Sequence, residues 1–250
     1  MKNQYKIKDM RDWRGVEADL IITDPPFGIE FDGKNGNYNR DTGNVVEGYV
    51  EWDKGKYKEE IEDLLDCINT NLSDNGQALI FSGWNNSHEI HRSINEFQGL
   101  NLEGKLYWNY NFAPYCKKRP AHNVYEIYWM VKGDDWYYNN ECDYDHCQDG
   151  EGNLSAVPVK RDYKKEMPKY PTRLPLKMIF ILLDHFSKEE DLVFDPLAGS
   201  GMVGIGSEIK NRNWVVGDLN KEGKRVFKEL VDFYKGEGHD LDIESSQKTL

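Results

Sequence analysis

The chain has 250 residues, of which 38% are hydrophobic and 13% aromatic. This length and apolar content predict a single α/β domain over residues 1–250, with a sizeable core. No stretch approaches the ~18 consecutive apolar residues of a membrane span, the first residues lack the apolar run of a secretory signal, and four cysteines are too few for a disulfide framework in a chain of this length. We therefore expect a cytoplasmic protein without a membrane partner.

The formal net charge of −12 argues against a nucleic-acid partner, because phosphate contacts require Lys and Arg. The charge is unevenly distributed, however. Residues 134–151 carry seven acids and no Lys or Arg, whereas residues 160–177 carry seven bases and two acids. A second basic cluster comprises Lys117, Lys118 and Arg119. This asymmetry permits a DNA-facing side, although charge runs of this kind commonly mark no more than a solvated surface.

Strands and helices alternate along the chain. In chain order, hydrophobic patterns predict a buried strand at residues 19–23, a helix over 57–72, a buried strand at 77–81, aromatic-rich strands at 105–108 and 124–131, a helix over 176–186, and buried strands at 191–194 and 214–217. The aromatic-rich segments alternate in polarity, which favours antiparallel pairing. Thr172 is placed to cap the second helix. We expect a doubly wound, mostly parallel sheet with an antiparallel edge hairpin, and ligand sites at the carboxyl ends of its strands.

Two long segments show no sustained period. Residues 28–56 are polar and rich in Gly and Asn, and residues 134–169 are more highly charged. Long loops in a compact domain are usually lids or binding loops. We expect the first to be an active-site loop.

The segment Asp24-Pro25-Pro26-Phe27 directly follows the buried strand at residues 19–23. Consecutive prolines fix φ and remove amide donors, so the chain leaves the strand in a stiff, extended turn. Such a turn holds the Asp24 carboxylate, the backbone carbonyls and the Phe27 ring in one small concavity. These groups offer acceptors to an exocyclic amino group and an aromatic face to a flat base. Taken alone, the motif is equally compatible with a strand-ending turn capped by Asp24.

A second motif consists, in order, of Phe194, Asp195, Pro196, Leu197, Ala198, Gly199, Ser200 and Gly201. It follows a strand and opens a predicted helix over residues 202–209. Glycines here allow a tight strand-to-helix turn and let the backbone approach a ligand closely. The next strand ends at Asp218, where nucleoside-binding folds place an acid that binds ribose. Together these features predict a nucleoside-cofactor site that also includes Leu219 and Asn220.

With these two motifs in this order, the sequence resembles the amino-methyltransferases of DNA, specifically their permuted β group. In that group a catalytic Asp-Pro-Pro-Tyr/Phe motif precedes the cofactor motif Asp-Pro-Phe-x-Gly-Ser-Gly. The resemblance covers about residues 6–233 and includes three further segments, Asp9-Met10, His122 to Glu126, and Tyr170 to Pro175. The sequence departs from the family pattern at four positions, with Tyr170 and Leu174 replacing His and Lys, Leu197 replacing Phe, and Asp218 standing where Glu is common.

The resemblance implies an enzyme that transfers a methyl group from S-adenosylmethionine (SAM) to the N6 amino group of adenine in double-stranded DNA. Catalysis falls to Asp24, Pro25, Pro26 and Phe27, which would hold a base flipped out of the stack. The implied SAM contacts are Asp9, Met10, Asp24, Thr172, the motif from Phe194 to Gly201, and the segment Asp218, Leu219 and Asn220. Residues 28–56 would face DNA, and residues 134–169 would recognise the target sequence. We assign DNA contacts to the basic residues Lys117, Lys118, Arg119, Lys160, Arg161, Lys164 and Lys165.

Several alternatives remain open at the level of sequence. Cytosine N4 methylation uses the same chemistry, although Ser usually replaces Asp24 in the motif that marks it. An RNA or protein amide methyltransferase typically carries Asn there, and a non-catalytic nucleotide-binding protein leaves the motif unexplained. The spacing of Cys142, His146 and Cys147 fits no common zinc pattern, so no metal is expected. A homodimer and a cognate restriction endonuclease are further partners that the resemblance allows.

Overall fold

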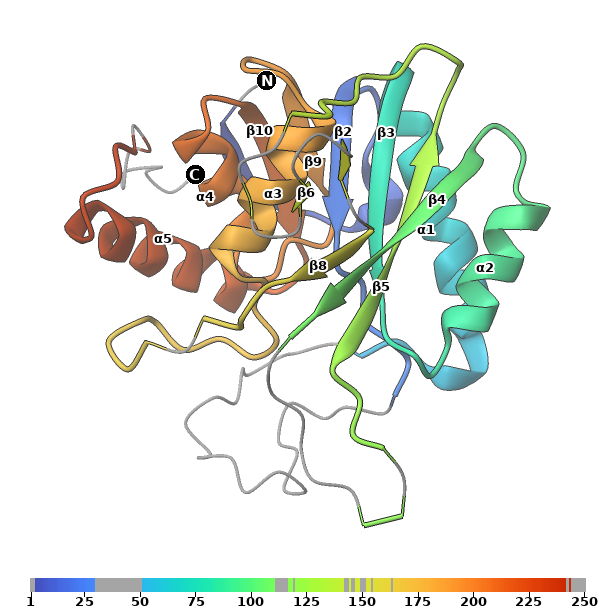
Figure 1. Cartoon of the computed structure of the whole chain (residues 1–250), viewed down its shortest axis with the longest axis horizontal. Helices are drawn as coiled ribbons and strands as arrows, with labels where there is room; N and C mark the ends of the chain where they lie inside the picture. The colour runs from blue at the N-terminus through green and yellow to red at the C-terminus, as the bar shows by residue number, and fades with distance from the viewer. Residues whose placement is uncertain are drawn as a thin grey trace.

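The computed structural model describes residues 3–29, 51–110, 117–118, 120–141, 144, 147–148, 152–153, 155–162, 164–241 and 243. Within these ranges, one eight-stranded sheet has the order β1-β10-β9-β2-β3-β5-β4-β8 (Figure 1). Its strands are β1 Gln4–Ile7, β2 Ala18–Thr23, β3 Leu72–Ser82, β4 Asn101–Asn109, β5 Val124–Val131, β8 Ala156–Pro158, β9 Leu192–Asp195 and β10 Asn213–Asp218. Two short strands, β6 Cys147–Gln148 and β7 Gly152–Asn153, pair only with each other.

The sheet is parallel except at β5, which runs antiparallel to both β3 and β4. The predicted buried strands and the predicted antiparallel pair are therefore confirmed. The pair is not the edge of the sheet, however, because β8 pairs in parallel with β4 and forms the outermost strand. A strand of three residues is too short to leave a periodic pattern in the sequence.

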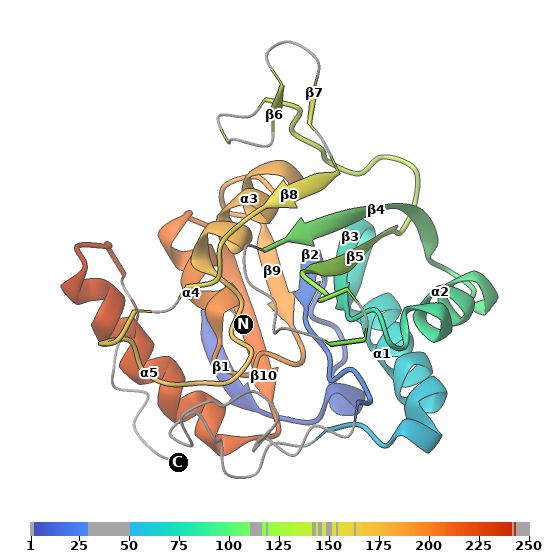
Figure 2. The same cartoon turned by 60° about the horizontal axis from the view of Figure 1, so that its bottom comes forward.

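Helices cover both faces of the sheet (Figure 2). They are α1 Tyr57–Asn71, α2 Ser87–Glu96, α3 Leu176–Phe186, α4 Met202–Ile209 and α5 Lys221–Gly236. Helices α1 and α2 lie on one face, and α3, α4 and α5 lie on the other. In the described part of the chain, every helix is too short or too polar to span a membrane.

The central strand β2 shows why its sequence is a nearly continuous apolar run. Ile21 packs in a core cluster with residues of α1, whereas Leu20 and Ile22 pack in another cluster with residues of α3. A parallel strand with helices on both faces buries its odd and even residues alike. The core therefore fixes β2 rigidly, and the residue that follows it, Asp24, leaves the sheet from a well-anchored strand.

Thr172 does not cap α3, contrary to the expectation from sequence. The N-cap position is occupied by Pro175, which makes no side-chain cap, and Thr172 lies in a turn with a positive φ of 55°. The amide of Leu176 at the helix start donates instead to the carboxylate of Asp162, at 3.0 Å. A capping side chain must stand directly before the first helical residue, and Thr172 is too far upstream for that role.

Candidate active site

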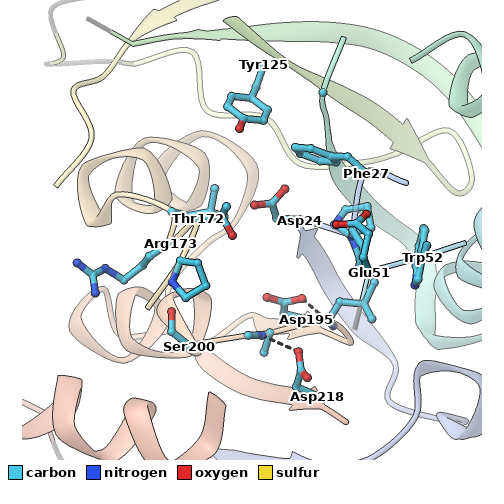
Figure 3. A pocket seen from close by; sticks show the side chains of 18 of the residues that line it. Asp24, Phe27, Glu51, Trp52, Tyr125, Thr172, Arg173, Asp195, Ser200 and Asp218 are labelled. Atoms are coloured by element: carbon cyan, nitrogen blue, oxygen red, sulfur yellow. Dashed lines mark hydrogen bonds between the residues drawn. The ribbon is translucent and has the colours of Figure 1, made fainter. Parts of the chain in front are cut away.

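A cavity of about 350 Å³ opens at the carboxyl ends of the parallel strands. Asp24 follows β2, Gly83 follows β3, Asp195 ends β9 and Asp218 ends β10, and all four line this cavity. Parallel strands end at the same edge of a sheet, so residues far apart in sequence meet there. Figure 3 shows Asp24 with Phe27 and Tyr125 on one side and Asp195 and Asp218 on the other. Both sequence motifs therefore face one space.

Asp24 occupies a place between the two halves of the cavity. One of its carboxylate oxygens is buried and has no hydrogen-bond partner among the described residues. Burial raises the pKa of the Asp24 carboxyl to about 7, Arg161 opposes this rise, and Glu51 adds to it. An acceptor without a donor in a buried place is costly, unless a ligand supplies the donor. Asp24 is thus suited to receive an N–H group from a bound molecule.

The turn after Asp24 is held from both sides. The carbonyl of Phe27 accepts a hydrogen bond from the Asn86 amide group at 2.6 Å, and the amide of Gly28 donates to the Glu51 carboxylate at 2.5 Å. A Cβ added at Gly83 would lie 2.9 Å from the Phe27 ring, so this glycine is what lets the ring settle against the end of β3. The Phe27 ring is consequently fixed at the wall of the cavity.

An aromatic wall continues from Phe27. It consists of Phe27, Tyr125, Trp108 and Tyr110, whose neighbouring ring centroids lie 5.3 to 5.5 Å apart. All four line the cavity, together with Arg161. The sequence does not predict Tyr125 and Tyr110 as site residues. The aromatic alternation in and next to β4 and β5 predicts that these segments form a sheet, but it does not predict that their ends line a cavity. A wall of this kind offers stacking area to a flat ring.

The other half of the cavity is formed by the loop between β9 and α4. Asp195 accepts a hydrogen bond from the Leu197 amide at 3.1 Å, and Asp218 accepts from the amides of Gly199 and Asn220 at 2.8 and 2.7 Å. Burial raises the pKa of Asp195 to about 8 and also raises the pKa of Asp218. The loop therefore presents carboxylates, rather than free amides, to a ligand.

Most of the residues predicted to bind the cofactor line this cavity. They are Asp9, Met10, Asp24, Thr172, Asp195, Leu197, Ala198, Gly199, Ser200, Asp218, Leu219 and Asn220. Phe194, Pro196 and Gly201 do not: Phe194 is fully buried against Trp13, and Gly201 starts α4 where a side chain would strike Phe227. Asp9 lies at the rim with both carboxylate oxygens engaged by Arg11 at 2.9 Å.

The basic residues predicted to contact DNA are not brought together. Of those that the structure describes, Arg161 alone lines the cavity. Lys117, Lys118, Lys160, Lys164 and Lys165 are exposed, and Lys164 forms an ion pair with Glu237. Arg119 lies outside the described residues.

The two long loops are described only in part. Residues 30–50 and several positions between 142 and 154 lie outside the described residues, so the predicted roles of 28–56 and 134–169 stay predictions. Glu51 and Trp52, at the end of the first loop, line the cavity. Within the described ranges, no three His, Cys, Asp or Glu side chains are grouped to hold a metal, and Cys142 and His146 lie outside those ranges.

Comparisons with known proteins agree on one family. The type II methyltransferase M2.LlaDCHI of Lactococcus lactis subsp. cremoris is 25% identical over 226 residues, which are 86% of this chain and 82% of that protein. The DNA adenine methyltransferase YhdJ of Escherichia coli (strain K12) is 24% identical over 230 residues, which are 82% of this chain and 73% of that protein.

Solved structures show the same fold. The M1.HpyAVI–SAM complex has a TM-score of 0.62 at 20% identity, covering 87% of this chain and 90% of that one. The cytosine-N4-specific PvuII DNA methyltransferase has a TM-score of 0.65 at 14% identity, covering 94% and 92%. The model of the N6/N4 DNA methylase family matches residues 18–229. That match spans both motifs and the cavity between them, and the chain belongs to the N6/N4 family of DNA methylases.

Proposed function

We propose that this protein transfers a methyl group from SAM to the N6 amino group of adenine in double-stranded DNA, with the target base flipped into the cavity. The observation that carries the proposal is the buried, unpartnered oxygen of Asp24, placed between the aromatic wall and the carboxylates of the β9–α4 loop. A relative named as a DNA adenine methyltransferase supports adenine as the target.

The charges around the cavity favour SAM over a dinucleotide. In dinucleotide-binding folds, the amides of the glycine loop contact the pyrophosphate. Here the Gly199 amide already donates a hydrogen bond to Asp218, and the side chains of Asp195 and Asp218 line the cavity. A diphosphate would add negative charge beside these two buried acids, whereas a ligand that carries positive charge favours their ionised form. We assign the SAM nucleoside to Asp195, Asp218 and the loop between them.

The catalytic work falls to the turn after β2. When bound, SAM supplies a methyl group made electrophilic by its sulfonium charge. Asp24 and the carbonyl of Pro25 accept the two amino hydrogens of the base, which directs the nitrogen lone pair toward that methyl. The base plane lies against Phe27. In the transition state the nitrogen–carbon bond would form as the carbon–sulfur bond breaks, and the Asp24 carboxylate would stabilise the positive charge that grows on the nitrogen. The sulfur would leave as a neutral thioether, and the nitrogen would then lose one proton to water.

The test is transfer of labelled methyl from SAM to unmethylated duplex DNA, followed by digestion and separation of the nucleosides. We expect label in N6-methyldeoxyadenosine. Asp24→Asn should lower kcat/KM by at least about 100-fold, as expected for loss of a transition-state partner, while SAM affinity changes only a few-fold. Undiminished transfer by the variant would remove Asp24 from the mechanism.

Cytosine N4 is the second candidate target, because a structural neighbour is specific for it and the chemistry is shared. Label in N4-methyldeoxycytidine would show that cytosine is the target base, with the same active site.

A relative named as a type II methyltransferase supports a further proposal, that the methylated sites protect DNA from a cognate restriction endonuclease. Sedimentation of the protein with and without DNA would test the proposed homodimer.

A further inference from the structure

Arg161 is held in the cavity by the backbone on both sides of it. Two residues before it, the Val159 amide donates to the Asn109 carbonyl at 3.0 Å, and the Val159 carbonyl accepts from the Trp108 indole at 2.8 Å. One residue after it, the Asp162 carboxylate accepts the Leu176 amide at the start of α3. The chain is therefore tied to β4 and to α3 within three positions of Arg161, which fixes where its side chain begins.

The guanidinium of Arg161 lies over the aromatic wall. Its central carbon is 4.8 Å from the ring centroid of Trp108, 4.7 Å from that of Tyr110 and 5.2 Å from that of Tyr125. Its charge opposes the rise that burial causes in the pKa of the Tyr125 hydroxyl. Three ring faces attract a cation, and they hold this one inside the cavity, apart from the exposed lysines on the surface. The geometry differs from that of a phosphate contact, which the sequence suggested.

Arg161 and Asp24 line the same cavity, and the guanidinium lies over the Tyr125 ring that packs against Phe27 of the same turn. Arg161 lowers the pKa of the Asp24 carboxyl, whereas Glu51 raises it. Among the described residues, the acids Tyr57 in α1, Tyr125 in β5 and Asp195 in β9 also interact with Asp24. Burial and acidic neighbours favour the protonated form of Asp24, whereas a nearby cation favours the ionised form. Only the ionised form of Asp24 can both accept a hydrogen bond from the amino group and stabilise the positive charge that grows on its nitrogen.

We propose that Arg161 is a positioning residue that favours the ionised form of Asp24 in the buried cavity and thereby sets the lower pH limit of methyl transfer. The proposal rests on the proposed function, because Arg161 acts through Asp24. It separates Arg161 from the neighbouring basic residues, which remain candidates for contact with the DNA backbone.

The first experiment needs neither substrate nor cofactor. Thermal unfolding is measured from pH 5 to pH 9 for the wild type, Asp24→Asn, Arg161→Met and the double variant. Because folding raises the pKa of Asp24, the wild type loses stability relative to Asp24→Asn as pH rises, until Asp24 is ionised in the folded state. With Arg161 present, we expect the difference in stability between the wild type and Asp24→Asn to level off near pH 7. Without Arg161, the corresponding difference between Arg161→Met and the double variant should level off roughly half to one pH unit higher. The same levelling pH with and without Arg161 would overturn the proposal.

The second experiment is the pH profile of kcat/KM for methyl transfer. Arg161→Met should shift the acid limb to higher pH, so that the loss of activity is several-fold greater at pH 6.5 than at pH 8.5. Arg161→Lys, which keeps the charge, should restore much of the profile. Arg92→Met removes an arginine on α2 that lies 61% exposed beside Glu96 and serves as the matched control with a wild-type profile.

Two outcomes would contradict the role of Arg161. A loss that is equal at every pH, with a weaker dependence on salt, would indicate a phosphate contact. An equal loss in Arg161→Met and Arg161→Lys would indicate packing against the aromatic wall. If the wild type transferred no methyl to DNA, the proposed function would fail, but the unfolding series would still show whether Arg161 controls the charge of Asp24.

Discussion

The carboxyl of Asp24 combines two opposing requirements within one residue. Burial raises its pKa to about 7, whereas its proposed role needs the ionised form. A bound cation favours ionisation, since it interacts with the carboxylate and not with the neutral acid. The sulfonium of SAM is such a cation, and S-adenosylhomocysteine, the product, lacks it. Cofactor charge and the protonation of Asp24 should therefore be linked.

This linkage predicts that pH changes the preference for SAM over S-adenosylhomocysteine. Between pH 6 and pH 8 Asp24 passes from mostly protonated to mostly ionised, so the ratio of the two Kd values should shift toward SAM by about a few-fold. Isothermal titration calorimetry at both pH values measures the ratio. Asp24→Asn should remove most of the shift. A ratio that depends on pH equally in both proteins would mean that Asp24 does not respond to the sulfonium.

Helix α5 supports the loop between β9 and α4, to which we assign SAM binding, although no residue of α5 lines the cavity. Gly223 in its first turn lies against the backbone of Gly199, and the Tyr5 hydroxyl donates to the Gly199 carbonyl at 2.6 Å. The loop is thereby clamped between β1 and α5. Its shape depends on two elements whose sequences carry none of the motif residues.

Gly223→Ala should consequently weaken SAM binding. The added methyl would overlap the Gly199 carbonyl oxygen and approach the Tyr5 hydroxyl to 2.7 Å. Overpacking of this kind costs about 1–3 kcal/mol, which lowers Tm by several degrees, and the displaced loop should raise the Kd of SAM about tenfold or more. Gly236→Ala at the other end of α5 is the control, because an added Cβ there has no atom within 4 Å. Equal Kd values for the two variants would show that α5 does not shape the loop.

At the scale of the whole molecule, DNA binding has to overcome a net charge of −12. The residues that line the cavity include many acids, and most of the candidate DNA-contacting lysines stand apart on the surface. Attraction to the phosphates of DNA must then come from local clusters of basic side chains. Lys117 and Lys118 are exposed and lie between β4 and β5, the strands that carry the aromatic wall.

Replacing these two lysines should change the salt dependence of DNA binding. Each lost phosphate contact reduces the slope of log Kd against log salt by about 0.9, so Lys117→Gln with Lys118→Gln should reduce it by about 1 to 2 without altering SAM affinity. Fluorescence anisotropy with labelled duplex at several salt concentrations gives the slope. Lys58→Gln, which removes a lysine paired with Glu62 and Glu96, is the control. An unchanged slope in the double variant would place the phosphate contacts elsewhere.

The features of this protein that follow from local pattern could be predicted without the structure. Buried parallel strands are continuous apolar runs because both faces of the sheet are covered, and the order of the Asp24 and Asp195 motifs indicates the family. Gly199 and Gly201 adopt the positive φ angles that glycine permits, and the double proline restricts its own backbone. Helix α3 was predicted with its observed bounds, since its apolar stripe is dictated by the turn of the helix.

Which side chains lie together depends on how distant segments pack. Arg161 belongs to a basic run that predicts an exposed surface, yet the hydrogen bonds of Val159 and Asp162 on either side place it against the aromatic wall. Tyr125 packs against Phe27, 98 positions away in the sequence, and Gly223 lies against Gly199, 24 positions away, so no local pattern indicates either contact. The cap of α3 comes from Asp162 rather than from Thr172 for the same reason. Contacts between distant segments depend on how strands and helices pack, and that packing is a property of the whole chain.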